Sequence, residues 1–111
     1  MATQAKNFRG SWRIVHMDTW DNDYPDLIEP AFIAFDKGGQ GELVFGAVKG
    51  WLDCRYGEHN GRPVVEFSWE GVSEGDQICG RGWATQTSDG KLEGHLYIHN
   101  SDDAPFKAEK R

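Results

Sequence analysis

The twenty residues Trp51–Glu70 have the sequence WLDCRYGEHNGRPVVEFSWE, and they decide the fold. The dipeptide Asn60-Gly61 near their centre suits a two-residue hairpin turn, because both positions of that turn take a positive φ angle. Centring the hairpin there sets Cys54 opposite Phe67 and brings the apolar side chains of both arms onto one face. The stretch therefore predicts two antiparallel strands with one buried and one exposed side.

Three more turn sequences extend this pattern. Lys37–Gly39 and Ser73–Gly75 each suit a three-residue turn whose last position favours glycine, and Asp89-Gly90 suits a two-residue turn. On this basis we predict eight strands: Phe8–Met17, Ala31–Asp36, Gly41–Phe45, Trp51–Tyr56, Val64–Glu70, Gln77–Thr87, Lys91–His99 and Phe106–Lys110. The registers predict one inner face made of Ile33, Phe35, Leu43, Phe45, Leu52, Cys54, Tyr56, Val65, Phe67, Trp69, Cys79, Arg81, Trp83, Leu92, Leu96 and Ile98.

A sheet of eight antiparallel strands has two exposed edges, and closing it into a barrel hides both. We therefore expect an all-β fold, an antiparallel up-and-down eight-stranded β-barrel that residues 1–111 form as a single domain. A two-sheet β-sandwich would use the same alternation and is the alternative fold. Eight strands leave an interior that side chains fill, or that just holds one small ligand.

Charge and composition exclude several classes of protein. Twelve Lys and Arg against eighteen Asp and Glu give a net charge of −6, which disfavours binding to nucleic acids and to anionic membranes. No run of about 18 apolar residues is long enough for a membrane-spanning helix. The amino-terminal residues show no secretory signal, so we expect a cytoplasmic protein with free thiols at Cys54 and Cys79.

The segment Phe8-Arg9-Gly10-Ser11-Trp12 resembles the Gly-x-Trp motif on the first strand of the calycin barrels, which include lipocalins, fatty-acid-binding proteins and avidins. In lipocalins this tryptophan closes one end of the barrel, and a basic residue of the last strand covers it. The resemblance implies that Trp12 closes the barrel under one of three basic residues: Lys107, Lys110 or Arg111. Residues 65–71 and 80–84 also resemble a group of small bacterial proteins of unknown function, which implies no activity.

Arg81 points inward in the predicted register. A buried guanidinium must be paired, so Arg81 either forms an internal ion pair or anchors the carboxylate or phosphate of a ligand. The leading hypothesis is a small-molecule site at the barrel mouth, lined by Arg81, Trp69, Trp83 and Tyr56. The acidic loop Asp18–Asp26 would act as its lid, with Trp20 and Tyr24 in contact with the ligand.

Two further hypotheses compete with this one. A protein-interaction or structural module would have a barrel packed solid and an outer face that docks a partner, and the barrel could form a homo-oligomer through such a face. An enzyme would use His16, paired with Asp18 or Asp21, in an open cleft. No nucleophile, phosphate-binding or dinucleotide-binding motif occurs, so we name no catalytic residue and expect no cofactor. The acidic loop departs from calcium-binding spacing, so we expect no metal and predict a solvated loop.

Overall fold

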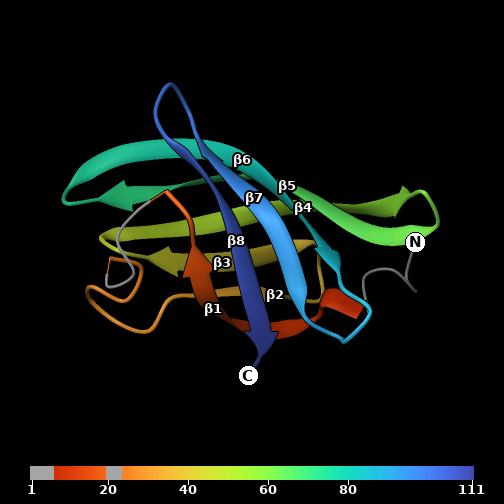
Figure 1. The fold of residues 1–111 in the computed structure, drawn as a ribbon. Coiled ribbons are helices and arrows are strands. Elements are labelled where there is room, and N and C mark those ends of the chain that lie inside the picture. Colours follow the sequence, from red (N-terminus) through yellow and green to blue (C-terminus); the bar gives the residue numbers. More distant parts are fainter. Residues whose placement is uncertain (1–6, 20–23) are drawn as a thin grey trace.

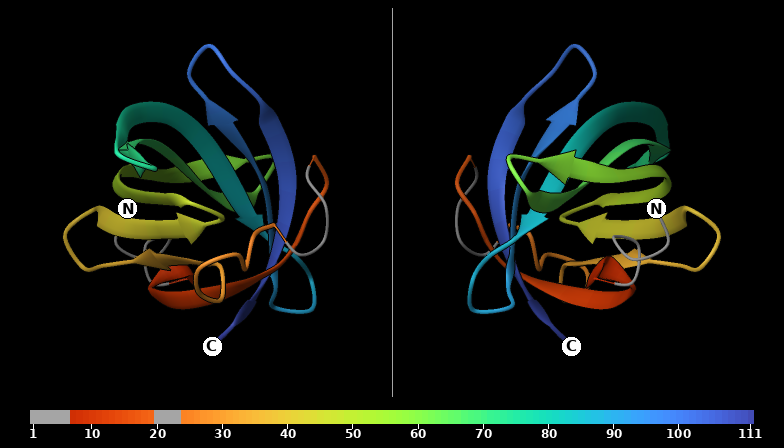
Figure 2. Two further views of the ribbon diagram at one scale, coloured as in Figure 1. Left: turned by 90° about the vertical axis from the view of Figure 1, so that its left-hand side faces the viewer. Right: turned by 90° about the vertical axis from the view of Figure 1, so that its right-hand side faces the viewer.

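The computed structural model describes residues 7–19 and 24–111, which form a closed, all-β barrel. In this part of the chain, eight antiparallel strands follow one another around the barrel, and the last pairs with the first (Figures 1 and 2). They are β1 (Gly10–Met17), β2 (Phe32–Phe35), β3 (Gln40–Phe45), β4 (Val48–His59), β5 (Arg62–Ser73), β6 (Asp76–Gln86), β7 (Leu92–Ile98) and β8 (Asp103–Lys110). The predicted up-and-down barrel is confirmed, and closure of the sheet excludes the sandwich. No helix within the described ranges has the length and hydrophobicity needed to span a membrane.

The registers of two predicted hairpins are confirmed. Cys54 lies opposite Phe67 across the Asn60-Gly61 turn, and both turn residues have a positive φ angle. Ile33 lies opposite Leu43 across the turn between β2 and β3. These registers place the apolar residues of β2 to β5 on the inner face of the barrel, as predicted.

The predicted register of β6 is wrong by one residue. Glu74 takes a positive φ angle of 52°, so that Glu74-Gly75 forms a two-residue turn and Ser73 pairs with Asp76. A shift of one residue exchanges the two faces of a strand. The predicted inward residues of β6 therefore point outward and are exposed: Cys79, Arg81 and Trp83.

The turn that follows β6 restores the predicted faces of β7. Its loop has three residues, Ser88–Gly90, and the Thr87 backbone N–H donates to the Lys91 carbonyl oxygen at 2.8 Å. Leu92 and Leu96 are consequently buried, as predicted. Only the β6 strand is reversed, because the two errors in turn length cancel.

Aromatic rings fill the barrel interior where neighbouring strands carry glycine. A Cβ atom at Gly50 would lie 2.9 Å from a ring carbon of Trp69, and one at Gly80 would lie 2.9 Å from the Trp69 indole nitrogen. A Cβ atom at Gly82 would lie 2.7 Å from the Phe67 ring. Gly80 and Gly82 on the inner face of β6 thus leave room for the large rings of β5 that lie in front of them.

The buried core runs through all eight strands. Its members are Phe8, Trp12, Ile14, Met17, Ala31, Ile33, Phe35, Leu43, Phe45, Val48, Leu52, Cys54, Val65, Phe67, Trp69, Ala84, Leu92, Leu96, Ala104, Phe106 and Ala108, with Tyr24, Tyr56, Ile78 and Ile98 packed against them.

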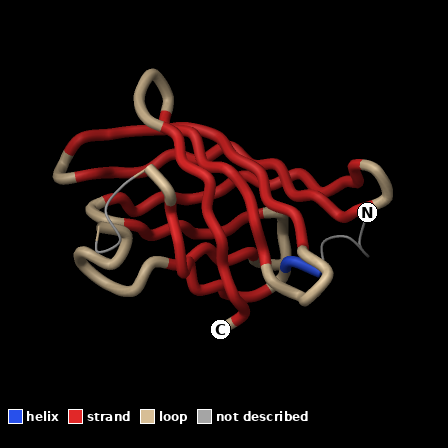
Figure 3. Tube along the Cα trace, in the orientation of Figure 1, coloured by secondary structure: helices blue, strands red, loops and turns tan. Residues whose placement is uncertain are grey.

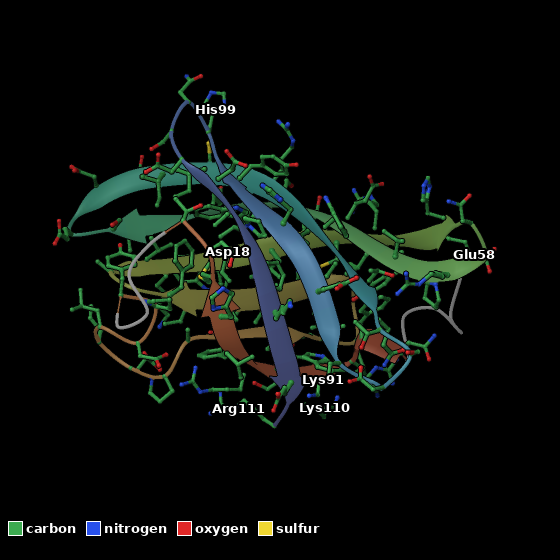
Figure 4. All side chains as sticks on the ribbon, in the orientation of Figure 1. Asp18, Glu58, Lys91, His99, Lys110 and Arg111 are labelled. Atoms are coloured by element: carbon green, nitrogen blue, oxygen red, sulfur yellow. The ribbon has the colours of Figure 1, made fainter. Side chains whose placement is uncertain are left out.

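Residues 7–8 are helical and close one end of the barrel (Figure 3). The Phe8 ring is fully buried, with its centroid 6.0 Å from that of Phe35 and 5.9 Å from that of Tyr56. Trp12 donates its indole N–H to the Phe8 carbonyl oxygen at 2.8 Å. Lys110, labelled in Figure 4, brings its Nζ atom to 4.8 Å from the Trp12 ring. Of the three covering residues that the calycin resemblance implies, Lys110 is the one that covers Trp12.

The loop between β1 and β2 packs on the opposite end. Tyr24 lies against the core and occupies the space in front of Gly46. Arg13 of β1 donates two hydrogen bonds, at 2.9 and 2.8 Å, to the carboxylate of Asp26. The same carboxylate accepts the Ala31 backbone N–H at 2.8 Å, and both interactions lower the pKa of Asp26. This aspartate therefore anchors the loop to the barrel.

Candidate functional site

The residues predicted to line a ligand site do not share one space. Trp69 and Tyr56 point into the barrel, but Arg81 and Trp83 point outward, so the predicted inward site built on all four is wrong in its geometry. Tyr24 packs on the core at one barrel end, and Trp20 lies outside the described residues. Whether any of these side chains contacts a ligand stays a prediction.

The sequence of β6 itself contains a signal for the observed register. With Arg81 inside, an arginine is buried among apolar side chains, which costs several kcal/mol when it is unpaired. With Gly80 and Gly82 inside, that cost disappears, and the rings of β5 fit into the space in front of the two glycines. The run Gly80-Arg81-Gly82-Trp83-Ala84 fits the second arrangement, in which the small residues alternate inward.

Trp83 borders three depressions on the outer surface. The first, of about 430 Å³, lies over β5 between Arg55 and Arg81. The second, of about 590 Å³, follows the hairpin of β4 and β5 toward Glu58, which is labelled in Figure 4. The third, of about 210 Å³, lies over β7 and β8 and reaches His16 of β1. Together they form a shallow trough across the strands, with the indole of Trp83 at its centre.

Nine side chains point outward from β4, β5 and β6 around the first depression and a neighbouring one of about 390 Å³, and we call them the β4–β6 outer face. They are Trp51, Asp53 and Arg55 of β4, Glu66, Ser68 and Glu70 of β5, and Cys79, Arg81 and Trp83 of β6. The hydrogen-bonded registers arrange them in three rows across the sheet: Trp51–Glu70–Cys79, Asp53–Ser68–Arg81 and Arg55–Glu66–Trp83. Trp51 is 49% exposed and Trp83 is 38% exposed.

Charged and aromatic side chains contact one another on and beside this face. Arg55 donates a hydrogen bond to the Asp53 carboxylate at 2.6 Å. The guanidinium of Arg81 lies 4.6 Å from the centroid of the Tyr97 ring, and that ring stacks on His95 with centroids 4.6 Å apart. The two acids and two arginines that line the first depression balance in charge, so it does not select for an anion. The surface suits a partner that carries both signs of charge beside apolar groups.

Two histidine–carboxylate pairs border the third depression. His16 contacts Asp18, which confirms one of its two predicted partners; the other, Asp21, lies outside the described residues. His95 contacts Asp103 in the same way. The described residues that line this depression include no serine, threonine or cysteine, and the His16 side chain is 46% exposed. Beside these pairs, the Thr19 hydroxyl donates a hydrogen bond to the Asp103 backbone carbonyl oxygen.

The two cysteines are free and lie in different environments. Cys79 is exposed on the β4–β6 outer face, whereas the sequence analysis predicted it inside the barrel. Cys54 is buried, and burial is the main cause that raises the pKa of its thiol to about 11. Burial likewise raises the pKa of the neighbouring Tyr56 to about 12. Both groups are therefore neutral at physiological pH, and the Cys54 thiol serves as a small apolar side chain.

Within residues 7–19 and 24–111, no cluster of three or more His, Cys, Asp or Glu side chains is arranged to hold a metal ion. Asp21 and Asp23 of the acidic loop lie outside this part of the chain. Asp26 of the same loop forms an ion pair with Arg13.

Comparison of the chain with protein-family models, with curated proteins and with solved structures finds no significant match.

Proposed function

We propose that this protein is a non-catalytic protein-interaction module, which docks its partner on the outer surface of the barrel around Trp83. The observation that carries the proposal is the partly exposed Trp83 at the junction of three depressions. Tryptophan and arginine dominate the binding energy of protein interfaces, since they combine a large contact area with polar groups. Arg55 lies in the same row as Trp83, on the other side of β5, and Arg81 lies two residues before Trp83 on β6.

The packing of the barrel interior supports an outer site over one inside the barrel. Trp69 and Phe67 fill the space in front of the glycines of neighbouring strands. Phe8 closes one end of the barrel, and Tyr24 packs on the other. Binding of a small molecule at the barrel mouth is the weaker proposal, because it would have to displace these packed side chains.

We further propose that the barrel is calycin-like. The Gly10-x-Trp12 sequence on β1, the helical residues before it and the cover of Trp12 by Lys110 support this assignment. The assignment concerns architecture and carries no ligand with it.

Native mass spectrometry of the protein isolated from its own host tests the interaction proposal. The wild type should retain a bound polypeptide chain, and Trp83→Ala should lose it. Ile28→Ala serves as the matched control, because Ile28 is an exposed apolar residue of the loop between β1 and β2, away from the trough. A small molecule retained by both the wild type and Trp83→Ala, with no bound polypeptide in either, would contradict the proposal and favour a ligand carrier.

A further inference from the structure

Building on the proposed function, we infer that the partner on the β4–β6 outer face is a second copy of this chain. The first reason is where apolar surface is exposed. Of the six exposed large hydrophobic residues in the described part of the chain, Trp51, Val72 and Trp83 lie on β4, β5 or β6 with their side chains on the outside of the barrel. The other three lie on β1 and in the loop that follows it: Val15, Leu27 and Ile28. Exposed apolar groups gathered on one face mark an interaction surface.

The second reason is that the charges of this face complement themselves. In the central row, Asp53 of β4 and Arg81 of β6 lie on either side of Ser68 of β5. Consider two copies stacked through their β4–β6 outer faces, with a twofold axis between the faces that runs parallel to β5. This axis places β6 of one copy opposite β4 of the other. Asp53 of each copy then meets Arg81 of the other copy. A twofold interface needs such a self-complementary surface, and every favourable contact occurs twice.

The same axis also places the outer residues of the two neighbouring rows opposite each other in the two copies. Arg55 and Trp83 lie on either side of Glu66, so the guanidinium of one copy stacks on the indole of the other. Trp51 and Cys79 lie on either side of Glu70. The exposed indole of Trp51 then enters the depression of about 390 Å³ that Cys79 and its neighbours line on the second copy. The outer members of all three rows thus pair in one orientation.

The geometry also sets the strength of the contact. The strands of stacked sheets cross at about 30°, which separates facing residues more the farther they lie from the axis. Asp53 and Arg81 lie only one strand spacing, about 4.8 Å, from the axis, so Asp53 of one copy stays within reach of Arg81 of the other. Nine residues are fewer than the roughly 20–30 residues that each partner contributes to a standard interface. Glu66 and Glu70 lie on the axis, where each approaches its own copy and opposes association. We therefore expect a reversible dimer that dissociates in the micromolar range.

A charge-exchange experiment tests this inference. Sedimentation equilibrium of the full chain is measured from about 5 to 500 µM, the range that brackets a micromolar dissociation constant. The wild type should change from monomer to dimer. Asp53→Arg and Arg81→Asp should each weaken dimerisation by about tenfold or more, because each variant places like charges opposite one another twice. The double variant Asp53→Arg/Arg81→Asp restores opposite charges and should recover most of the affinity.

Glu29→Arg and Lys37→Asp are the matched controls, since they make the same charge changes in loops away from this face. Both should dimerise as the wild type does, and circular dichroism should show that all variants fold. A wild type that stays monomeric throughout the concentration range overturns the inference, and so does a dimer that the double variant fails to restore. If a different polypeptide is nevertheless held through Trp83, the interaction proposal survives without the homodimer.

Discussion

Phe8→Ala tests whether the Phe8 ring closes the barrel end and contributes to the stability of the core. The side chain is fully buried between Phe35 and Tyr56, and Phe8→Ala removes both ring contacts. The lost transfer free energy is about 2 kcal/mol. A residual cavity of roughly 100 Å³ adds about 2 kcal/mol, since cavities cost about 24 cal/mol per Å³. We expect a total loss of about 4 kcal/mol in the free energy of unfolding.

Urea denaturation followed by tryptophan fluorescence measures this loss. For a domain of this size, a loss of about 4 kcal/mol lowers Tm by roughly 15 °C. Phe32→Ala is the matched control, because Phe32 is half-buried on the outside of β2 beside Arg111 and should cost less than about 1.5 kcal/mol. A Phe8→Ala variant that loses less than about 1 kcal/mol, with an unchanged denaturant slope, would refute the closed barrel end.

Two further predictions follow from the packed interior. Gly80→Ala should destabilise the barrel by about 1–3 kcal/mol in urea denaturation, because the new methyl group would overlap the Tyr97 carbonyl oxygen and the Trp69 indole. The Cys54 thiol has a pKa of about 11 when folded and 9.0 as its ordinary value, so its contribution to stability is complete below pH 9 and is lost between pH 9 and 11. By pH 11 the wild type should lose about 2–3 kcal/mol more than Cys54→Ala does, as measured by urea midpoints at each pH.

Each of these predictions has a control within the chain. Gly57→Ala should be tolerated, since no heavy atom lies within 4 Å of the position of its added Cβ. Gly80→Ala with unchanged stability would mean that the Trp69 ring is not packed against β6. In a Cys79→Ser background, only one thiol ionises and its absorbance reports Cys54 directly. If the free energy of unfolding falls by the same amount at alkaline pH in the wild type and in Cys54→Ala, the Cys54 thiol does not limit stability.

The turn residues account for what the sequence predicted well. Asn60 and Gly61 both take the positive φ angles that the two-residue turn needs, and this single assignment sets every pair between β4 and β5. The Gly10-x-Trp12 motif located the tryptophan that Lys110 covers. Such signals are local: the residues that specify the conformation are the residues that adopt it.

The turn between β5 and β6 shows where local signals fail. Ser73-Glu74-Gly75 accommodates a two-residue or a three-residue turn, and the choice depends on whether Glu74 adopts the left-handed region. That conformation costs a non-glycine residue only about 1–2 kcal/mol. Contacts made elsewhere can offset so small a cost, and the turn sequence alone does not decide between the two lengths.

The amino-acid sequence by itself determined the strands, their up-and-down order and the inward faces of β2 to β5, because alternation and turn chemistry are encoded within each hairpin. It left a two-sheet sandwich open, and the tertiary structure decided that the sheet closes into a barrel. Only the tertiary structure decided which face of β6 points outward. Burying Arg81 without a partner costs more than a strained Glu74, and the rings of Phe67 and Trp69 need the glycines of β6 in front of them. That balance moved Arg81 and Trp83 to the surface, where they form the proposed docking site.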